Sequence, residues 1–427
     1  MKTAILTLVC GLFVMGVSKS QESPPATAAL NAEAMKAYEA KDYARFLAYE
    51  TQALALEPNN PRLLYNVACG ESLQGNAREA VRRLDQVLSH RVDLGAETDP
   101  DFAGIRNTPE WTVFQSRLAE LRKPLARSQV AFTLPDPAIV ATGIAVDAKT
   151  GDTYIASVRQ RKILRRTKQG AVSDFIQPAQ DGFLAGDSLA VDSPRRLLYA
   201  TTSAVPYMLG YKQEDAGRSG LFAFDLKSGR LARKAMLAAD GKRHLLNALV
   251  VDHAGNVYVS DTGASGIYLL RPGATELEPF IPSSVFRATQ GLALSKGEKT
   301  LYVADYVDGL WAVDLASKHP QRLAIPAGAW LFGMDGLSRA GASLITVQIG
   351  PKPERVLRLW LDAAGKRVTK VETLEMSRAD YEDPIQGAVD GNAFLYVANS
   401  QLDLGDGKTG AFAADRARPT VVLRLAL

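Results

Sequence analysis

Residues 247–270, NALVVDHAGNVYVSDTGASGIYLL, carry the pattern on which the architecture of this chain depends. The stretch reads as three short apolar segments, residues 248–251, 257–260 and 266–270, separated by turns rich in Asp, Gly and Asn. Alternating apolar residues bounded by such turn formers predict short antiparallel strands. A unit that recurs at a regular spacing is typical of a repeat architecture, and this unit recurs along the chain.

Six copies are found when the first strand and the tyrosine position of the second strand are aligned. The copies begin at Thr142, Asp187, Asn247, Gln290, Asp335 and Gln386. A third strand recurs in all six, and a fourth apolar segment follows in the first five, for example at residues 174–178 and 323–326. The sixth copy ends with the chain, and the segment QVAFTLP at residues 129–135 is available to supply its fourth strand.

Six four-stranded units of about 50 residues each predict a mainly β fold, a six-bladed β-propeller over residues 129–427 closed by an N-terminal strand. Each blade has two faces to bury, so blades stack around a ring that leaves no open edge. The alternative is a β-sandwich with accidental self-similarity. The propeller is favoured because three strand columns repeat together.

An N-terminal all-α domain is predicted at residues 27–123, where the pattern changes to helical periods. Two segments align at a spacing of 34 residues, with residues 41–43 matching 75–77 and residues 53–54 matching 87–88. The pair resembles tetratricopeptide repeats, and a further helix at 109–121 is expected to cap it. This domain is expected either to hold a peptide or protein partner or only to cover the propeller.

The N-terminal segment predicts an exported protein. Lys2, the apolar residues 3–17 and the small residues Ser18 and Ser20 predict a signal peptide at 1–20, hence a periplasmic or secreted protein without stable membrane insertion after cleavage. An uncleaved anchor is the alternative. After cleavage Cys69 is the only cysteine, so no internal disulfide forms. The net charge of +4 is unclustered and argues against a nucleic-acid partner.

One column of residues carries the candidate chemistry: the first residue of each copy is polar and the next is small. In a propeller the first strand is innermost, so Thr142, Asp187, Asn247, Gln290, Asp335 and Gln386 are expected to ring the central channel. Oxygen ligands that include two carboxylates suit Ca²⁺ or Mg²⁺. Alternatively, the column closes the channel through hydrogen bonds and trapped water. His244, three residues before Asn247, is a further candidate base near the same face.

The blade motifs NALVVDHAGNVYVSD and QGLALSKGEKTLYVAD, together with Asp335-Gly336, resemble the senescence-marker-protein (regucalcin)/gluconolactonase superfamily. The resemblance implies a divalent metal on the axis that polarises a lactone or ester carbonyl. By position, Asn247 and Asp335 match its metal ligands. Gln290 stands where that family has Asn, and Thr142 stands where it has Glu. Asp187 of the second blade is then the residue available to replace the missing carboxylate.

Two functions follow as hypotheses. The first is an exported hydrolase of a small-molecule lactone or ester, with Asn247, Asp335, Gln290 and Asp187 as metal ligands and Asp335 or Asp187 accepting a proton. The second is a non-catalytic ligand- or protein-binding module that uses the helical repeats and the propeller as a scaffold.

Overall fold

The computed structural model describes residues 25–427, and the predicted signal peptide at 1–20 lies outside them. The chain divides into two compact units. One comprises residues up to 124 together with the short segments 325–330 and 350–353, and the other comprises residues 125–324, 331–349 and 354–427. Within the described residues, no helix combines the length and apolar character needed to cross a membrane.

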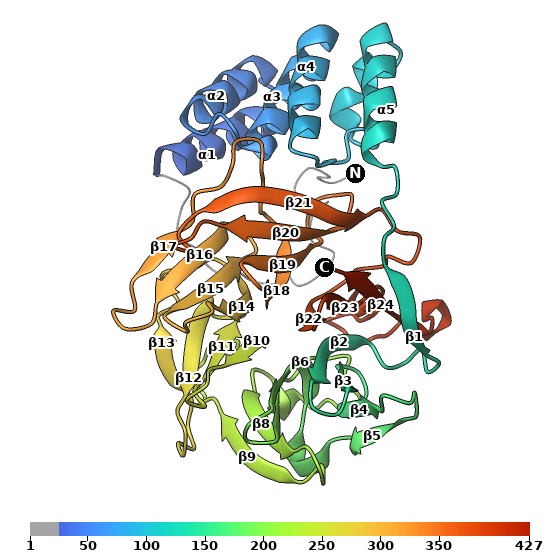
Figure 1. The fold of residues 1–427 in the computed structure, drawn as a ribbon. Coiled ribbons are helices and arrows are strands. Elements are labelled where there is room, and N and C mark those ends of the chain that lie inside the picture. The colour runs from blue at the N-terminus through green and yellow to red at the C-terminus, as the bar shows by residue number, and fades with distance from the viewer. Residues whose placement is uncertain (1–24) are drawn as a thin grey trace. The chain divides into compact units, whose positions relative to one another are not determined.

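The first unit is helical, as predicted (Figure 1). Its elements are α1 (Pro25–Glu39), α2 (Tyr43–Leu56), α3 (Pro61–Leu73), α4 (Ala77–Ser89), the 3₁₀ helix η1 (Pro100–Ile105) and α5 (Pro109–Leu121). Side chains of Asp42, Asn60 and Thr108 accept the first free N–H groups of α2, α3 and α5, which N-capping requires. Segment 90–107, which lacks helical periodicity, contributes η1 and packs Phe102 against Trp111.

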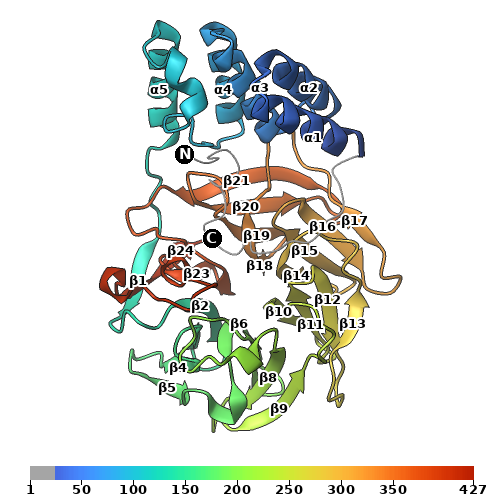
Figure 2. The same ribbon diagram turned by 180° about the vertical axis from the view of Figure 1, so that it is seen from behind.

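The second unit is a six-bladed propeller, which confirms the predicted fold (Figure 2). From the axis outward, its first three blades are β2 (Ala141–Asp147), β3 (Asp152–Ser157), β4 (Lys162–Arg166) and β5 (Val172–Ile176); β6 (Ala185–Asp192), β7 (Leu197–Ser203), β8 (Ser219–Asp225) and β9 (Leu231–Met236); and β10 (Leu246–Val251), β11 (Val257–Asp261), β12 (Gly266–Leu270) and β13 (Glu278–Ile281).

The remaining blades are β14 (Thr289–Leu294), β15 (Thr300–Asp305), β16 (Gly309–Asp314) and β17 (Pro320–Arg322); β18 (Met334–Ala340), β19 (Ser343–Gln348), β20 (Arg355–Leu361) and β21 (Val368–Met376); and β22 (Gly387–Asp390), β23 (Ala393–Val397), β24 (Thr420–Ala426) and β1 (Gln129–Leu134). Short 3₁₀ turns η2 (Gln180–Gly182), η3 (Gln213–Asp215), η4 (Leu402–Leu404) and η5 (Ala414–Arg416) lie in connections. One expectation was wrong: the outer strand of the fourth blade is β17, just before the predicted residues 323–326.

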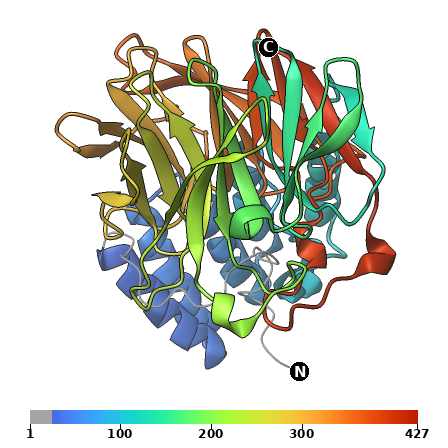
Figure 3. The same ribbon diagram turned by 90° about the horizontal axis from the view of Figure 1, so that it is seen from below.

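The ring closes on both its inner and outer sides. Each inner strand contacts the next, and β22 of the last blade contacts β2 of the first. The outer strand of the last blade is β1, which pairs antiparallel with β24. A buried carboxylate secures the entry to β1, because Glu375 accepts the backbone N–H groups of Arg127 and Ser128 at 2.9 and 3.0 Å. The strands run side by side around the ring (Figure 3).

Apolar side chains fill the space between neighbouring blades. Between the first two blades, for example, Tyr154, Phe183, Leu198 and Phe222 are nearly or fully buried in one cluster. Burial of such surfaces on both faces of each sheet is the dominant stabilising term. It also holds the inner strands at the axis in a defined arrangement.

Candidate functional site

The inner strands crowd at the axis because small residues follow the polar column. A Cβ atom on Gly143 would lie 2.0 Å from the carbonyl oxygen of Asp187, and one on Gly336 would lie 2.2 Å from the Cβ of Gln386. Gly336 also has a φ of +68°, a region that side chains disfavour. Glycine at these positions therefore lets consecutive inner strands come into contact.

An irregularity in the sheet register accompanies the column in the first five blades. The pairing of the inner and second strands skips two residues, in the first blade between Ala141 and Ile144 and in the fifth between Asp335 and Ser338. Such bulges redirect side chains. Hydroxyl groups of the second strand bind the backbone groups that the bulge leaves unpaired. Ser260 Oγ accepts the N–H of Ala248 at 2.9 Å and donates to the carbonyl of Gln290 at 2.7 Å.

Side chains of the column form hydrogen bonds with the side chains or the backbone of the neighbouring inner strands. Thr142 Oγ1 donates to the backbone carbonyls of Gly186 and Asp187 at 3.0 and 3.3 Å, and the Asn247 amide donates to Gln290 Oε1. The backbone N–H of Gln386 donates to Asp335 Oδ2 at 3.0 Å.

One contact crosses the ring. Ser188 Oγ donates to Gln386 Oε1 at 3.3 Å, although Ser188 belongs to the second blade and Gln386 immediately precedes the inner strand of the sixth. The structure thus brings the predicted column together at the axis.

Two carboxylates in this ring have altered acidity. Burial raises the pKa of Asp335, only 9% exposed, to about 6, and the N–H of Gln386 partly offsets the effect. Burial raises the pKa of Asp187 to about 7, and the negative charge of Asp335 adds to the shift while Thr142 opposes it. Asp187 retains some accessible surface. Both groups therefore change protonation near neutral pH.

A second polar column, at the ends of the second strands, has a structural role. These side chains hold the backbone segment that leads into each inner strand. Thr202 accepts the N–H of Leu184 at 2.9 Å, and Asp305 accepts the N–H groups of Arg287 and Ala288 at 2.7 and 3.0 Å. Such contacts satisfy backbone donors that would otherwise be buried without partners.

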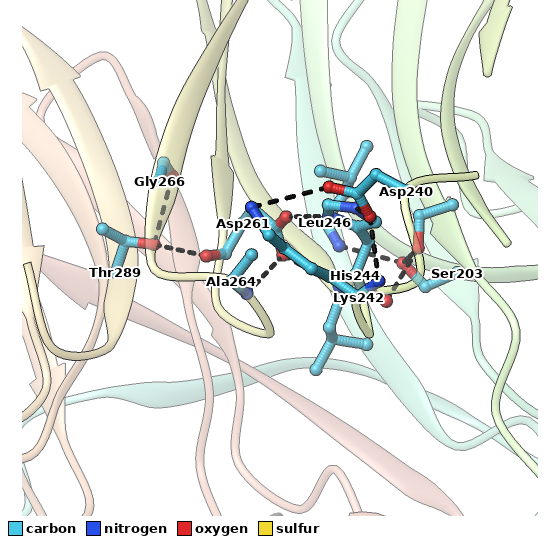
Figure 4. Close-up of polar contacts among 11 residues, drawn as sticks. Ser203, Asp240, Lys242, His244, Leu246, Asp261, Ala264, Gly266 and Thr289 are labelled. Carbon is cyan, nitrogen blue, oxygen red and sulfur yellow. Dashed lines mark hydrogen bonds and ion pairs between the residues drawn. The ribbon is translucent and has the colours of Figure 1, made fainter. Parts of the chain in front are cut away.

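His244 belongs to this structural layer (Figure 4). Its imidazole is 5% exposed and lies between two carboxylates, with Nδ1 2.5 Å from Asp261 Oδ2 and Nε2 2.9 Å from Asp240 Oδ1. Hydrogen bonding to Asp261 is the largest cause of its raised pKa. Asp261 Oδ1 also accepts the N–H of Leu245 at 2.9 Å. With both ring nitrogens engaged, His244 acts as a base only if Asp240 moves away.

Asp383 is a site residue that the sequence analysis missed. Burial raises its pKa to about 7, Ser400 opposes the shift, and the charges of Asp335 and Glu354 add to it. Ser400 Oγ donates to Asp383 Oδ2 at 2.9 Å. The available signal was positional, since Asp383 precedes Gln386 by three residues, as His244 precedes Asn247.

Comparisons with known proteins concern the fold. No protein-family profile matches the sequence, and no curated protein matches it. Solved structures that are similar include the calcium-binding protein regucalcin from Agrobacterium tumefaciens, with a TM-score of 0.48, 17% identity and coverage of 69% of this chain and 93% of its own. A gluconolactonase from Xanthomonas campestris has a TM-score of 0.47, 14% identity and coverage of 71% and 96%.

A luciferin-regenerating enzyme has a TM-score of 0.48, 12% identity and coverage of 71% of this chain and 96% of its own. At these identities and scores the likeness describes a shared six-bladed fold and carries no argument about activity. Any function must therefore be argued from the residues of this chain.

Proposed function

We propose that this protein hydrolyses a lactone or an ester at the propeller axis. The observation that carries the proposal is the pair of carboxylates Asp187 and Asp335, whose pKa values of about 7 and about 6 lie near neutrality. Among the described residues, no basic side chain contributes to the pKa shift of either carboxylate. Titratable groups displaced toward the working pH by burial and like charge are typical of catalytic sites.

The two carboxylates are suited to different steps. Asp335, with the lower pKa, loses its proton first and serves as the general base that accepts a proton from the attacking water. Asp187, whose acidity is reduced further by Asp335, retains its proton longer and serves as the general acid toward the leaving oxygen. Because the charges interact, the two apparent pKa values belong to the pair. Proton transfers of this kind contribute about 10²–10⁴-fold to rate.

The donor set fits a hard divalent cation. Asp335 offers a carboxylate oxygen, and Asn247 offers its amide oxygen because its nitrogen donates to Gln290. Asp187 would add a second carboxylate only by giving up the proton that it holds as general acid. Oxygen donors of this type suit Ca²⁺. Gln290 then orients Asn247. Thr142 is not a ligand in this arrangement, because its hydroxyl donates to a backbone carbonyl. Such a cation, when bound, would polarise a substrate carbonyl and lower the pKa of a bound water.

The test is hydrolysis of a panel of aldonolactones and aryl esters by the purified chain, with EDTA and with added Ca²⁺, Mg²⁺ or Mn²⁺. We expect metal-dependent turnover in the wild type and a loss of at least about 100-fold in Asp335→Asn. Asp390→Asn is the matched control, because Asp390 is an exposed carboxylate paired with Arg424 at 3.0 Å. Absence of turnover with every metal and substrate class would refute the hydrolase.

Calorimetry separates catalysis from binding. Heat of Ca²⁺ binding in the wild type that disappears in Asp335→Asn, without any turnover, would favour the non-catalytic ligand-binding module instead. Export is part of the proposal and rests on residues 1–20. Mass spectrometry of the mature protein is expected to show Gln21 as its first residue.

A further inference from the structure

Two elements of the helical unit bring a thiol and two carboxylates together. Cys69 lies on α3, Asp99 caps η1, and Asp101 lies within η1. The sulfur of Cys69 and one oxygen from each carboxylate all lie within 4.8 Å of one another. Thirty residues separate Cys69 from Asp99 in the chain, so only the packing of η1 on α3 creates the cluster.

One oxygen of this cluster is buried without a hydrogen bond. Asp101 is 6% exposed, and its Oδ1 accepts the hydroxyl hydrogen of Tyr38 at 2.8 Å. Among the described residues Asp101 Oδ2 is covered and has no partner at full hydrogen-bond geometry, and the polar group beside the Asp101 carboxylate is the Cys69 thiol. A buried acceptor left in this state costs about 1–3 kcal/mol, and more when it is charged. A metal ion bound by the thiolate and this carboxylate would remove that cost.

The surrounding residues hold the three groups in place. Tyr65, one turn before Cys69 on α3, donates its hydroxyl to Asp99 Oδ2 at 2.8 Å, and the N–H of Asp101 donates to Asp99 Oδ1 at 2.9 Å. Ser72 Oγ donates to the Asp101 carbonyl at 2.7 Å. Hydrogen bonds of this kind orient the carboxylate ligands of metal sites.

Acidic side chains surround the Cys69 thiol. Burial raises the pKa of the Cys69 thiol, and the charges of Asp99, Asp101 and Glu50 raise it further. Glu50 is 1% exposed, and burial raises its pKa to about 7 while the Asn66 side chain opposes the shift. The basic neighbour, Arg106, donates to the backbone carbonyl of Asp99 at 2.7 Å.

We propose that Cys69, Asp99 and Asp101 form a binding site for a divalent transition metal of the zinc class. Thiolate favours Zn²⁺ and Co²⁺ over Ca²⁺ or Mg²⁺, which prefer oxygen ligands alone. Tetrahedral bonds of about 2.3 Å to sulfur and about 2.0–2.2 Å to oxygen place ligand atoms roughly 3.5 Å apart, a spacing that atoms within 4.8 Å of one another reach by small side-chain movements. The metal displaces the thiol proton, and its affinity therefore increases with pH.

Co²⁺ is the probe, because a cobalt–thiolate bond produces a charge-transfer absorption band in the near ultraviolet. The purified full chain is expected to bind Co²⁺ with this band, and excess Zn²⁺ is expected to abolish it. Cys69→Ser should remove the band, and Asp101→Asn should weaken Co²⁺ binding about tenfold or more. Cys10 is the other cysteine of the sequence. Cys10→Ser and Asp335→Asn should both retain the band, which separates the proposed site from that thiol and from the propeller axis.

The wild type alone can overturn the proposal: saturating Co²⁺ at pH 8 without a thiolate band would refute it. A band that persists in Cys69→Ser would do the same. Zn²⁺ should also raise the Tm of the wild type more than the Tm of Asp101→Asn, because a ligand that binds the folded state more weakly stabilises it less. Equal Zn²⁺ effects on both proteins would contradict the assignment.

Discussion

Replacing Asp187 by Asn should stabilise the propeller at alkaline pH. Burial and the charge of Asp335 raise the pKa of Asp187 from 3.8 to about 7. For an acid whose folded-state pKa is raised, the cost of ionisation is absent below the unfolded pKa and builds up until pH passes the folded pKa. Asn preserves the size of the side chain and cannot ionise, so the variant avoids this cost.

The magnitude follows from the displacement of the pKa. Each pKa unit corresponds to about 1.4 kcal/mol, so the full cost in the wild type is up to about 4 kcal/mol above pH 7. About 2–3 kcal/mol of it accumulates between pH 5 and pH 8.5, because part of the cost is already present at pH 5. This is a substantial fraction of the roughly 5–15 kcal/mol that stabilises a typical domain.

Urea unfolding of the wild type and Asp187→Asn at pH 5 and pH 8.5 measures the effect. The helical unit contributes equally to both proteins, so the change with pH in their stability difference isolates the axial carboxylate. Asp390→Asn is the control, and its difference from the wild type should stay within about 0.5 kcal/mol at both pH values. A stability difference that does not change with pH, or an Asp187→Asn variant that is less stable at pH 8.5, would refute the reasoning.

Three further substitutions test the packing and polar contacts of the propeller. Gly143→Ala should cost about 1–3 kcal/mol or more in urea unfolding, since the added Cβ would lie 2.0 Å from a backbone oxygen of the next inner strand; a change below 0.5 kcal/mol would contradict the crowding at the axis. Glu375→Gln should cost about 3–5 kcal/mol, because this fully buried carboxylate pairs with Arg378 at 3.1 Å and accepts the N–H groups at the entry to β1. Thermal unfolding should show a lower Tm, and an unchanged Tm would argue against a stabilising role for Glu375 at the start of β1. His244→Gln should destabilise more at pH 6 than at pH 9: hydrogen bonding to Asp261 raises the histidine pKa, so its stabilisation is complete below the unfolded pKa and is lost as pH rises through the folded one. Equal losses at both pH values would contradict the charged state of the imidazole.

The architecture could be predicted because its determinants are local and repeated. The strand at residues 266–270 was located to the residue as β12, and the polar column with its glycine neighbours indicated the crowded axis. The error at β17 arose because an apolar segment, residues 323–326, lies next to the strand and matches the repeat equally well. A short edge strand has little burial to distinguish it from its neighbours.

The details of the candidate site could not be predicted in the same way. His244 was identified near the axis, but its engagement by both Asp240 and Asp261 depends on how a loop folds over the end of a strand. Asp383 carried no motif, and its raised pKa reflects burial and the nearby charges of Asp335 and Glu354. Burial and electrostatic coupling are properties of the assembled ring rather than of any segment.

Residue periodicity alone establishes the helical region, the six repeated sheets and the polar ring at the start of their inner strands. The reason is that a strand's apolar alternation and its turn residues act within a few positions of one another. Tertiary packing alone decides which oxygens of the ring form hydrogen bonds and which carboxylates hold protons near pH 7. It also decides that Cys69 lies beside Asp99 and Asp101. Desolvation and Coulomb interactions depend on distances between groups that are far apart in the chain, and such distances exist only once the units have folded.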